Sequence, residues 1–371
     1  MDPYTFVVPS TTSSQWEALG YDRAYEAPVA AKGPFPLIMF SPGLFLNGWN
    51  YTYFGTRLAS HGYIVAVVEH FGDGVWLAST FEVNAMVLYN RPRDLSFALT
   101  EMLSRDRTPG DLLHRTIDRR YVVAAGHSYG GYAAMTELAG DDQVCDSNDI
   151  NAFGEEVPAA ACQPTPVDHR FTALLTLDAS THVLRWEEMS RIRVPSLIIG
   201  DASNADGDSP DTVDANDRAW VARAHAAVCS RTRSLRVDID NIEHLSFGSP
   251  CDGYTVLRNA NLMSQEDYDF YTAVWGCGER LPAGEAHRIV TKYAVAWLQA
   301  EVVKDGSELS KRILTREYDI THEPAVEVWW NEKCRCGGES QPGTFTYFRD
   351  MVPGTCAVAD KNPANWFILY P

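Results

Sequence analysis

The sequence predicts a doubly wound α/β fold, in which helices cover both faces of a mostly parallel β-sheet. Short apolar runs without polar alternation are typical of strands that are buried on both faces. Segments with helical spacing separate these runs along the chain. In addition, the run that begins at Tyr121 stops at a Gly-His-Ser-Tyr-Gly turn, directly before a helix-like segment. Ligands of such sheets bind at the carboxyl ends of the strands, so we expect the chemistry in the turns that follow them.

Each predicted element rests on its apolar pattern. The first strand, 36–40 (PLIMF), is an unbroken apolar run that ends in the turn Ser41-Pro42-Gly43-Leu44. A helix at 91–104 carries its apolar residues on one side. Further strands are expected at 63–68, 121–125, 173–177, 195–199 and 235–239, and further helices at 53–60, 217–228 and 285–300.

One domain accounts for residues 1–330, because no linker and no internal repeat divides this part of the chain. Residues 141–170 form a polar stretch bracketed by cysteines, which predicts an insertion after the helix that follows the Gly-His-Ser-Tyr-Gly turn. Residues 331–371 are rich in glycine, cysteine and aromatic side chains. We expect them to form a C-terminal extension packed on the same domain.

Composition excludes several classes of protein. Of the 371 residues, 45% are hydrophobic and 22% are charged, which indicates a sizeable core rather than a disordered chain. The formal net charge of -18 argues against nucleic acid or an anionic membrane surface as a partner. No apolar run is long enough for a transmembrane segment.

The eight cysteines favour an oxidising compartment, because most of them lie in polar loops. Cys145 and Cys162 bracket the insertion and are the expected disulfide pair. The start of the chain lacks the features of a secretory signal, so we expect the mature form of a secreted or periplasmic protein, with a cytoplasmic protein as the alternative. No metal and no cofactor are expected: Cys334 and Cys336 lack a second pair at zinc spacing, and the acidic run 201–211 lacks the spacing of an EF-hand.

The turn at 126–130 is expected to present a nucleophilic serine. Ser128 would occupy a sharp strand-to-helix turn with its hydroxyl pointing outward, and glycine at positions 126 and 130 relieves the crowding there. The following helix would direct its N-terminal N–H groups toward developing negative charge. A simple Gly/Ser connection is the alternative, but the strand–turn–helix context favours a nucleophile elbow.

A serine nucleophile needs a base that is oriented by a carboxylate, and in hydrolases of this fold class the chain order is Ser, acid, His. Of the histidines after Ser128, only His244 follows a predicted core strand by a short loop. Asp178 and Asp201 each end a predicted strand, and either could orient His244 or cap a following helix instead. The spacing leaves both acids open. The other histidines considered, His169, His182, His225 and His287, occupy less suitable positions.

Several sequence motifs, in the same order along the chain, resemble those of the plasma-type platelet-activating factor acetylhydrolases and their bacterial lipase- and cutinase-like relatives. The matching motifs are Phe40-Ser41-x-Gly43-Leu44, LASHGYIVAVVEH at 58–70, GHSYGG at 126–131, and TLDA at 176–179. The resemblance implies an α/β-hydrolase fold. It also implies that Asp178, in the Leu-Asp-Ala motif, is the triad acid, with Asp201 as the reserve acid, the alternative at this position of the triad.

The resemblance further implies an oxyanion hole formed by the backbone N–H groups of Leu44 and Tyr129. The family usually has histidine where this chain has Pro42. Proline lacks an N–H, but the required donor belongs to Leu44, so the hole can form. The apolar run at 74–89 could wall an acyl or alcohol pocket nearby, or could be buried structure.

The implied activity is that of a serine carboxylic-ester hydrolase, lipase- or esterase-like, acting on a small or short-acyl ester through an acyl-enzyme. Because the triad does not select the bond, a polyester, lactone, amide or β-diketone is an alternative substrate, and a cofactor-free haloperoxidase reaction uses the same residues. A non-catalytic binding module with the same fold is a further alternative. The expected partner is a small-molecule or polymeric ester.

Overall fold

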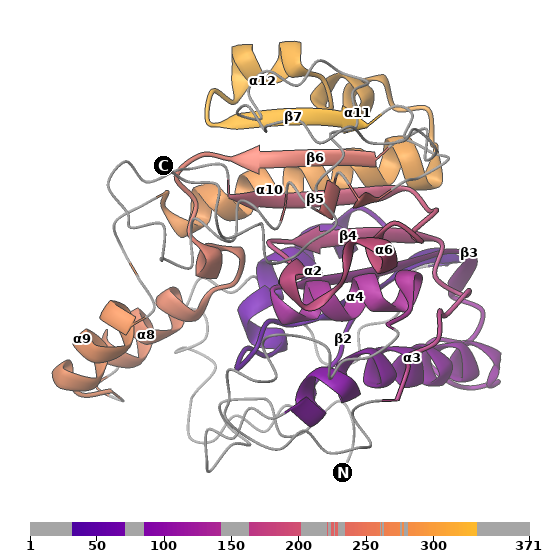
Figure 1. Ribbon diagram of the computed structural model, residues 1–371, viewed down its shortest axis with the longest axis horizontal. Helices are drawn as coiled ribbons and strands as arrows, with labels where there is room; N and C mark the ends of the chain where they lie inside the picture. Colours follow the sequence, from indigo (N-terminus) through magenta and orange to yellow (C-terminus); the bar gives the residue numbers. More distant parts are fainter. Residues whose placement is uncertain are drawn as a thin grey trace.

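The computed structural model describes residues 32–70, 85–141, 163–201 and most of 234–331, together with part of 221–228. Within these residues seven strands form one sheet in the order β2-β1-β3-β4-β5-β6-β7 (Figure 1). Neighbouring strands are parallel except for the pair β6 and β7. The predicted doubly wound, mostly parallel α/β fold is therefore confirmed.

The strands lie close to their predicted positions. β7 was not among the expected strands. It pairs antiparallel with β6 at the edge of the sheet. The strands are β1 (Phe35–Ser41), β2 (Ile64–Val67), β3 (Ile117–His127), β4 (Ala173–Leu177), β5 (Ser196–Asp201), β6 (Ser234–Ile239) and β7 (Val326–Asn331).

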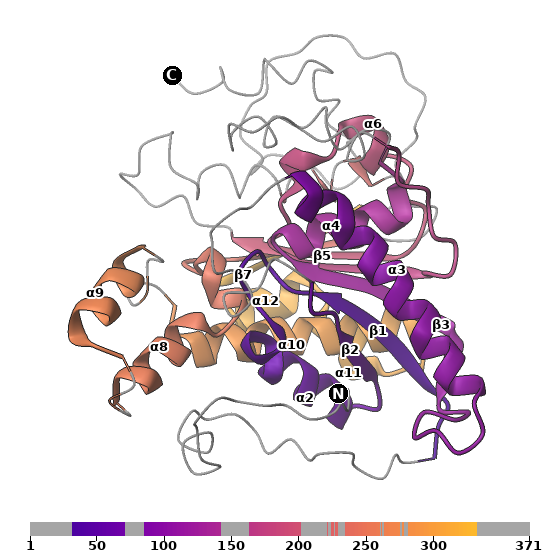
Figure 2. The same cartoon turned by 90° about the horizontal axis from the view of Figure 1, so that it is seen from below.

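Helices cover both faces of this sheet, as Figure 2 shows: α3 and α4 on one face, α2 and α10 on the other. The α-helices are α2 (Thr52–Ser60), α3 (Ala85–Arg107), α4 (Tyr129–Ala139), α6 (Trp186–Met189), α8 (Pro250–Asn259), α9 (Gln265–Val274), α10 (Ala283–Trp297), α11 (Glu308–Ile313) and α12 (Arg316–His322). Short helical turns are η1 (Gly48–Tyr51), η4 (Thr181–Val183), η5 (His244–Phe247) and η6 (Leu298–Val303).

The apolar runs of the central strands are unbroken because these strands are buried on both faces, as the sequence indicates. In β1, Leu37 and Met39 pack in the core beneath α3 and α4, whereas Ile38 and Phe40 pack in the core beneath α2 and α10. All four side chains are fully buried. A strand between two helical layers has no face for polar residues, so its sequence does not alternate.

The order of the strands reverses next to β1, because β2 lies on one side of it and β3 to β7 lie on the other. Ser41 at the end of β1 pairs with Gly126 of β3, and His127 pairs with Leu177 of β4. The carboxyl ends of these three strands therefore lie side by side. In doubly wound sheets the crevice at such a reversal is where ligands bind.

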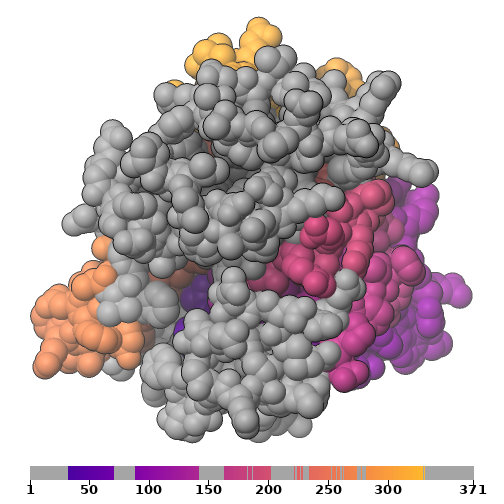
Figure 3. Space-filling view, in the orientation of Figure 1, coloured from indigo at the N-terminus to yellow at the C-terminus, as the bar shows by residue number. Residues whose placement is uncertain are grey.

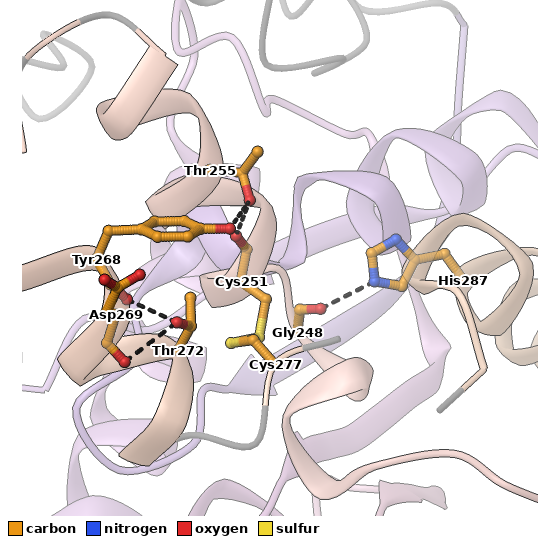
Figure 4. Close-up of a disulfide and its surroundings, with 8 residues drawn as sticks. All are labelled: Gly248, Cys251, Thr255, Tyr268, Asp269, Thr272, Cys277 and His287. Carbon is orange, nitrogen blue, oxygen red and sulfur yellow. Dashed lines mark hydrogen bonds between the residues drawn. A yellow bond between two sulfur atoms is a disulfide. The ribbon is translucent and has the colours of Figure 1, made fainter. Parts of the chain in front are cut away.

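The helices α8 and α9 form a hairpin that projects from the body of the protein (Figures 1 and 3). A disulfide between Cys251 and Cys277 joins its two ends (Figure 4). Neither the hairpin nor this pairing was predicted. The expected pair Cys145 and Cys162 lies outside the described residues.

The two predicted additions to the domain fall largely outside the described residues. Of the insertion 141–170, only its ends are described, and an antiparallel bridge between Asp141 and Thr165 brings these ends together. The extension is described only at Asn331, where β7 ends. The predicted domain boundaries stay predictions.

Candidate active site

Ser128 occupies the sharp turn between β3 and α4. Its backbone has φ 55° and ψ -125°, a conformation that a residue with a side chain rarely adopts. The turn is held from the next strand, because Ser128 N–H donates to the Leu177 carbonyl over 3.1 Å and the Ser128 carbonyl accepts from Ser180 N–H over 3.0 Å. These bonds over-determine the unusual backbone at the predicted nucleophile.

The glycines of this turn are required by close packing against the end of β1. A Cβ atom at Gly130 would lie 1.9 Å from the Ser41 carbonyl oxygen, and one at Gly126 would lie 2.2 Å from the Gly130 carbonyl oxygen. Neither position has room for a side chain. The turn at Ser128 and the turn that begins at Ser41 are therefore in direct backbone contact.

His244 opens the short helix η5, which follows β6 by a four-residue loop. Its Nδ1 lies 2.6 Å from Oδ2 of Asp178, whose side chain is almost fully buried while that of His244 is 21% exposed. Because a carboxylate only accepts, Nδ1 carries the hydrogen of this bond, and Nε2 remains as the basic nitrogen. Asp178 directly follows β4 and has a positive φ of 42°. The structure thus brings together two of the three predicted triad members.

Asp201, the reserve acid, lies at the end of β5 and is buried. His244 donates its hydrogen bond to Asp178, which lies one strand closer to Ser128 in the sheet. The strand order explains this arrangement, since β4 lies between β3 and β5.

Ser180 is a contact of Ser128 that the sequence reasoning missed. Its Oγ lies 3.4 Å from Ser128 Oγ, and it is buried. It follows Asp178 by two residues, where the chain leaves β4 toward η4. A serine in a turn has no distinctive sequence signal, so only the fold reveals this contact.

The turn after β1 is held by a buried cation. Arg91 of α3 is 1% exposed and donates to the Pro42 carbonyl over 2.6 Å and to the Gly43 carbonyl over 3.2 Å. The Gly43 carbonyl and the Leu44 N–H belong to one planar trans peptide group and point in opposite directions. Arg91 therefore fixes the direction of the Leu44 N–H, the predicted oxyanion donor. Tyr129, which provides the second predicted donor, is the first residue of α4.

A second Ser–His–Asp chain of hydrogen bonds lies behind this turn. Ser41 Oγ is 2.7 Å from His70 Nε2, and His70 Nδ1 is 2.9 Å from Asp94 Oδ2. Arg91 Nη1 approaches Ser41 Oγ at 3.4 Å. Ser41 is fully buried, so this chain braces the end of β1 instead of presenting a nucleophile.

Two other histidines have structural contacts. His225 is partly buried, and desolvation lowers its pKa to about 3. Nε2–H of His287 in α10 donates a 2.9 Å hydrogen bond to the Gly248 carbonyl (Figure 4). The His287 ring also stacks on Tyr53. The side chain of His182 and most of the runs 74–89 and 201–211 lie outside the described residues.

Within the part of the chain that the structure describes, no group of three or more His, Cys, Asp or Glu side chains is arranged to hold a metal ion. Among the same residues, no helix combines the length and the apolar character needed to cross a membrane.

Parts of the sequence are similar to known proteins. The family described as platelet-activating factor acetylhydrolase, isoform II, matches residues 7–91. The platelet-activating factor acetylhydrolase of Bos taurus is 28% identical over 182 residues, which cover 38% of this chain and 41% of that protein. The enzyme of the same name from Cavia porcellus is 30% identical over 155 residues, which cover 32% of this chain and 35% of that protein. The chain thus matches less than half the length of these relatives.

The fold is also similar to a solved structure, the ferulic acid esterase from Streptomyces cinnamoneus, with a TM-score of 0.52. The match covers 80% of this chain and 74% of that chain at 20% sequence identity. At this identity the similarity concerns the fold. The sheet topology and this match show an α/β-hydrolase fold, and parts of the sequence are similar to the platelet-activating factor acetylhydrolases.

Proposed function

We propose that this protein is a serine hydrolase of carboxylic esters, with Ser128 as nucleophile, His244 as base and Asp178 as the acid that orients the base. The observation that carries the proposal is the bond between His244 Nδ1 and Asp178 at the same sheet edge as the strained Ser128 turn. This bond leaves Nε2 of His244 as the nitrogen that can accept a proton.

In the proposed reaction, Nε2 of His244 takes the proton of the Ser128 hydroxyl as Oγ attacks the ester carbonyl carbon. Asp178 stabilises the imidazolium that forms. The tetrahedral oxyanion would accept hydrogen bonds from the N–H groups of Leu44 and Tyr129, and the dipole of α4 adds favourable potential at Tyr129.

Collapse of the tetrahedral intermediate breaks the bond to the alcohol oxygen, and His244 returns its proton to that oxygen. Water then attacks the acyl-enzyme by the same route, with His244 as base, and releases the acid and the free Ser128 hydroxyl. No redox partner and no other co-reactant is needed for these steps.

The substrate that we propose is a small ester with a short acyl chain. The support is the similarity to proteins whose name, acetylhydrolase, states removal of an acetyl group. A secreted or periplasmic location is part of the proposal, because the disulfide between Cys251 and Cys277 is typical of an oxidising compartment.

The test compares Ser128→Ala with Ser60→Ala, a serine at an exposed helix end. Hydrolysis of p-nitrophenyl acetate and labelling by a fluorophosphonate are measured on both variants. We expect both signals to disappear in Ser128→Ala and to persist in Ser60→Ala. Turnover retained by a folded Ser128→Ala protein would refute the proposal. A panel of acetyl to decanoyl esters then gives the acyl-chain preference.

A further inference from the structure

The histidine inside the nucleophile turn makes two hydrogen bonds in opposite directions. His127 is fully buried at the end of β3. Its Nε2 lies 2.9 Å from the carbonyl oxygen of His244, and its Nδ1 lies 2.7 Å from the hydroxyl oxygen of Tyr51. One ring therefore contacts both the loop of the proposed base and the end of η1.

The direction of each bond follows from the chemistry of the partners. A carbonyl oxygen only accepts, so Nε2 of His127 carries the hydrogen. Burial holds the pKa of His127 well below its ordinary value, so the ring is neutral and Nδ1 is an acceptor. The Tyr51 hydroxyl therefore donates to Nδ1, and its oxygen accepts from the Gly43 N–H over 2.9 Å. The chain of donors runs from Gly43 through Tyr51 and His127 to the backbone of His244.

The two ends of this chain are the two parts of the proposed machinery that must keep a fixed separation. Gly43 is covalently joined to Leu44, whose N–H is the proposed oxyanion donor, and the other end is the backbone of the proposed base. The rings pack tightly as well, with centroids 4.7 Å apart for His127 and His244 and 5.8 Å apart for Tyr51 and His127.

The contact also explains glycine at position 43. A Cβ atom there would lie 2.9 Å from His127 Nδ1 and 3.3 Å from the Tyr51 hydroxyl oxygen. Any side chain would push into the hydrogen-bonded pair. Glycine at this turn is thus required by the approach of His127 and Tyr51.

We infer that the buried His127 imidazole, together with Tyr51, is a positioning element that sets the backbone of His244 relative to the Leu44 N–H. The inference rests on the proposed function. Neither side chain is assigned contact with substrate. Both act through the groups that they orient, so their loss should lower kcat and leave KM nearly unchanged.

Three variants separate the two bonds. Tyr51→Phe removes only the hydroxyl and keeps the ring that packs on Phe40. His127→Gln can place an amide N–H near the position of Nε2 but has no acceptor at the position of Nδ1. His127→Asn can place an acceptor near Nδ1 and loses the donor to His244. The rate is measured as kcat for each active site titrated with fluorophosphonate, so that misfolded protein does not count.

We expect His127→Gln and His127→Asn each to lower kcat per titrated site about fivefold to tenfold, the effect of one neutral hydrogen bond. Tyr51→Phe should lower it at least as much, because it also removes the acceptor of the Gly43 N–H. Tyr51→Phe and His127→Gln both break the bond between Tyr51 and His127, so the double variant should be no slower than Tyr51→Phe alone. Tyr51→Phe and His127→Asn break different bonds, so their effects should multiply. No substitution of Tyr51 should restore the rate of His127→Asn.

A merely structural role predicts a different result: a lower unfolding temperature and fewer titrated sites, with kcat per site within twofold of the wild type. That result in Tyr51→Phe alone, the mildest variant, overturns the inference even if the His127 variants do not fold. Failure of the proposed function looks different, because Ser128→Ala would then retain turnover or the wild type would not be labelled.

Discussion

Asp178 accepts a 2.6 Å hydrogen bond from Nδ1 of His244, a residue 66 positions further along the chain. The carboxylate is almost fully buried at the end of β4, whereas Asp201 ends the next strand of the sheet. If Asp178 stabilises the imidazolium, Asp178→Asn should lower kcat on the order of 10⁴-fold, as loss of a triad acid does. Ester hydrolysis at pH 8 measures the effect. Asp201→Asn is the matched control and should retain most of the activity; the reverse ranking would make Asp201 the acid.

Arg91 is expected to be required for both stability and rate, because it binds the carbonyl groups of Pro42 and Gly43. Arg91→Met leaves buried acceptors without this donor and should lower the free energy of unfolding by about 2 kcal/mol. It should also lower kcat, since the direction of the Leu44 N–H is no longer fixed. Arg93→Met is the control on the same helix: Arg93 bonds Tyr89 and Thr165 instead, so stability should fall without a loss of kcat per titrated site.

The pH profile should show one acid limb. His244 must be neutral to accept the proton of Ser128, so kcat/KM should fall below about pH 6, near the ordinary pKa of histidine. His127 does not add a second limb, because burial keeps its pKa well below the ordinary value. The profile of p-nitrophenyl acetate hydrolysis between pH 4 and pH 9 measures this. A rate that stays flat down to pH 4 would contradict a histidine base.

Glu137 of α4 should make the protein less stable as the pH rises. Burial, with a contribution from Asp168, raises the pKa of this carboxyl to about 9, while its ordinary value is 4.5. Between these values the folded state binds a proton that the unfolded state has lost, so stability falls as pH rises through this window. Glu137→Gln should remove this decline and raise the free energy of unfolding at pH 8 on the order of 2 kcal/mol. Unfolding temperatures at pH 5 and pH 8 test it, with exposed Glu308→Gln as the control; an unchanged slope in Glu137→Gln would contradict the prediction.

The fold could be predicted because strands that lie between two layers of helices have unbroken apolar sequences. The run at 36–40 has no polar residue since both of its faces are buried, and the Gly-x-Ser-x-Gly word reflects backbone contacts that exclude a Cβ atom. β7 was missed because it is an antiparallel edge strand, and its sequence VEVWWN lacks the unbroken apolar run of the buried strands. The hairpin α8–α9 projects from the sheet and has no core pattern to reveal it.

The site could be predicted only in part, for a similar reason. Residues that lie in a short motif or directly after a strand, such as Ser128 and Asp178, can be recognised by their position in the sequence. The residues that hold them in place have no such signal. Tyr51 reaches the site from η1 and Arg91 from α3, and the contact of Ser180 with Ser128 depends on the pairing of β3 with β4. Such contacts depend on which distant segments the complete fold brings together, and no local motif reveals that.

The hairpin α8–α9 leaves the body of the protein just after the helix of His244 and returns just before α10. The Cα atoms of Cys251 and Cys277 are 5.6 Å apart, although 26 positions separate them. Since neighbouring Cα atoms lie about 3.8 Å apart, a single inserted residue could bridge that gap. The projection is therefore a replaceable module: evolution or an engineer could shorten, lengthen or exchange it while η5, which carries the proposed base, and every strand of the sheet stay where they are.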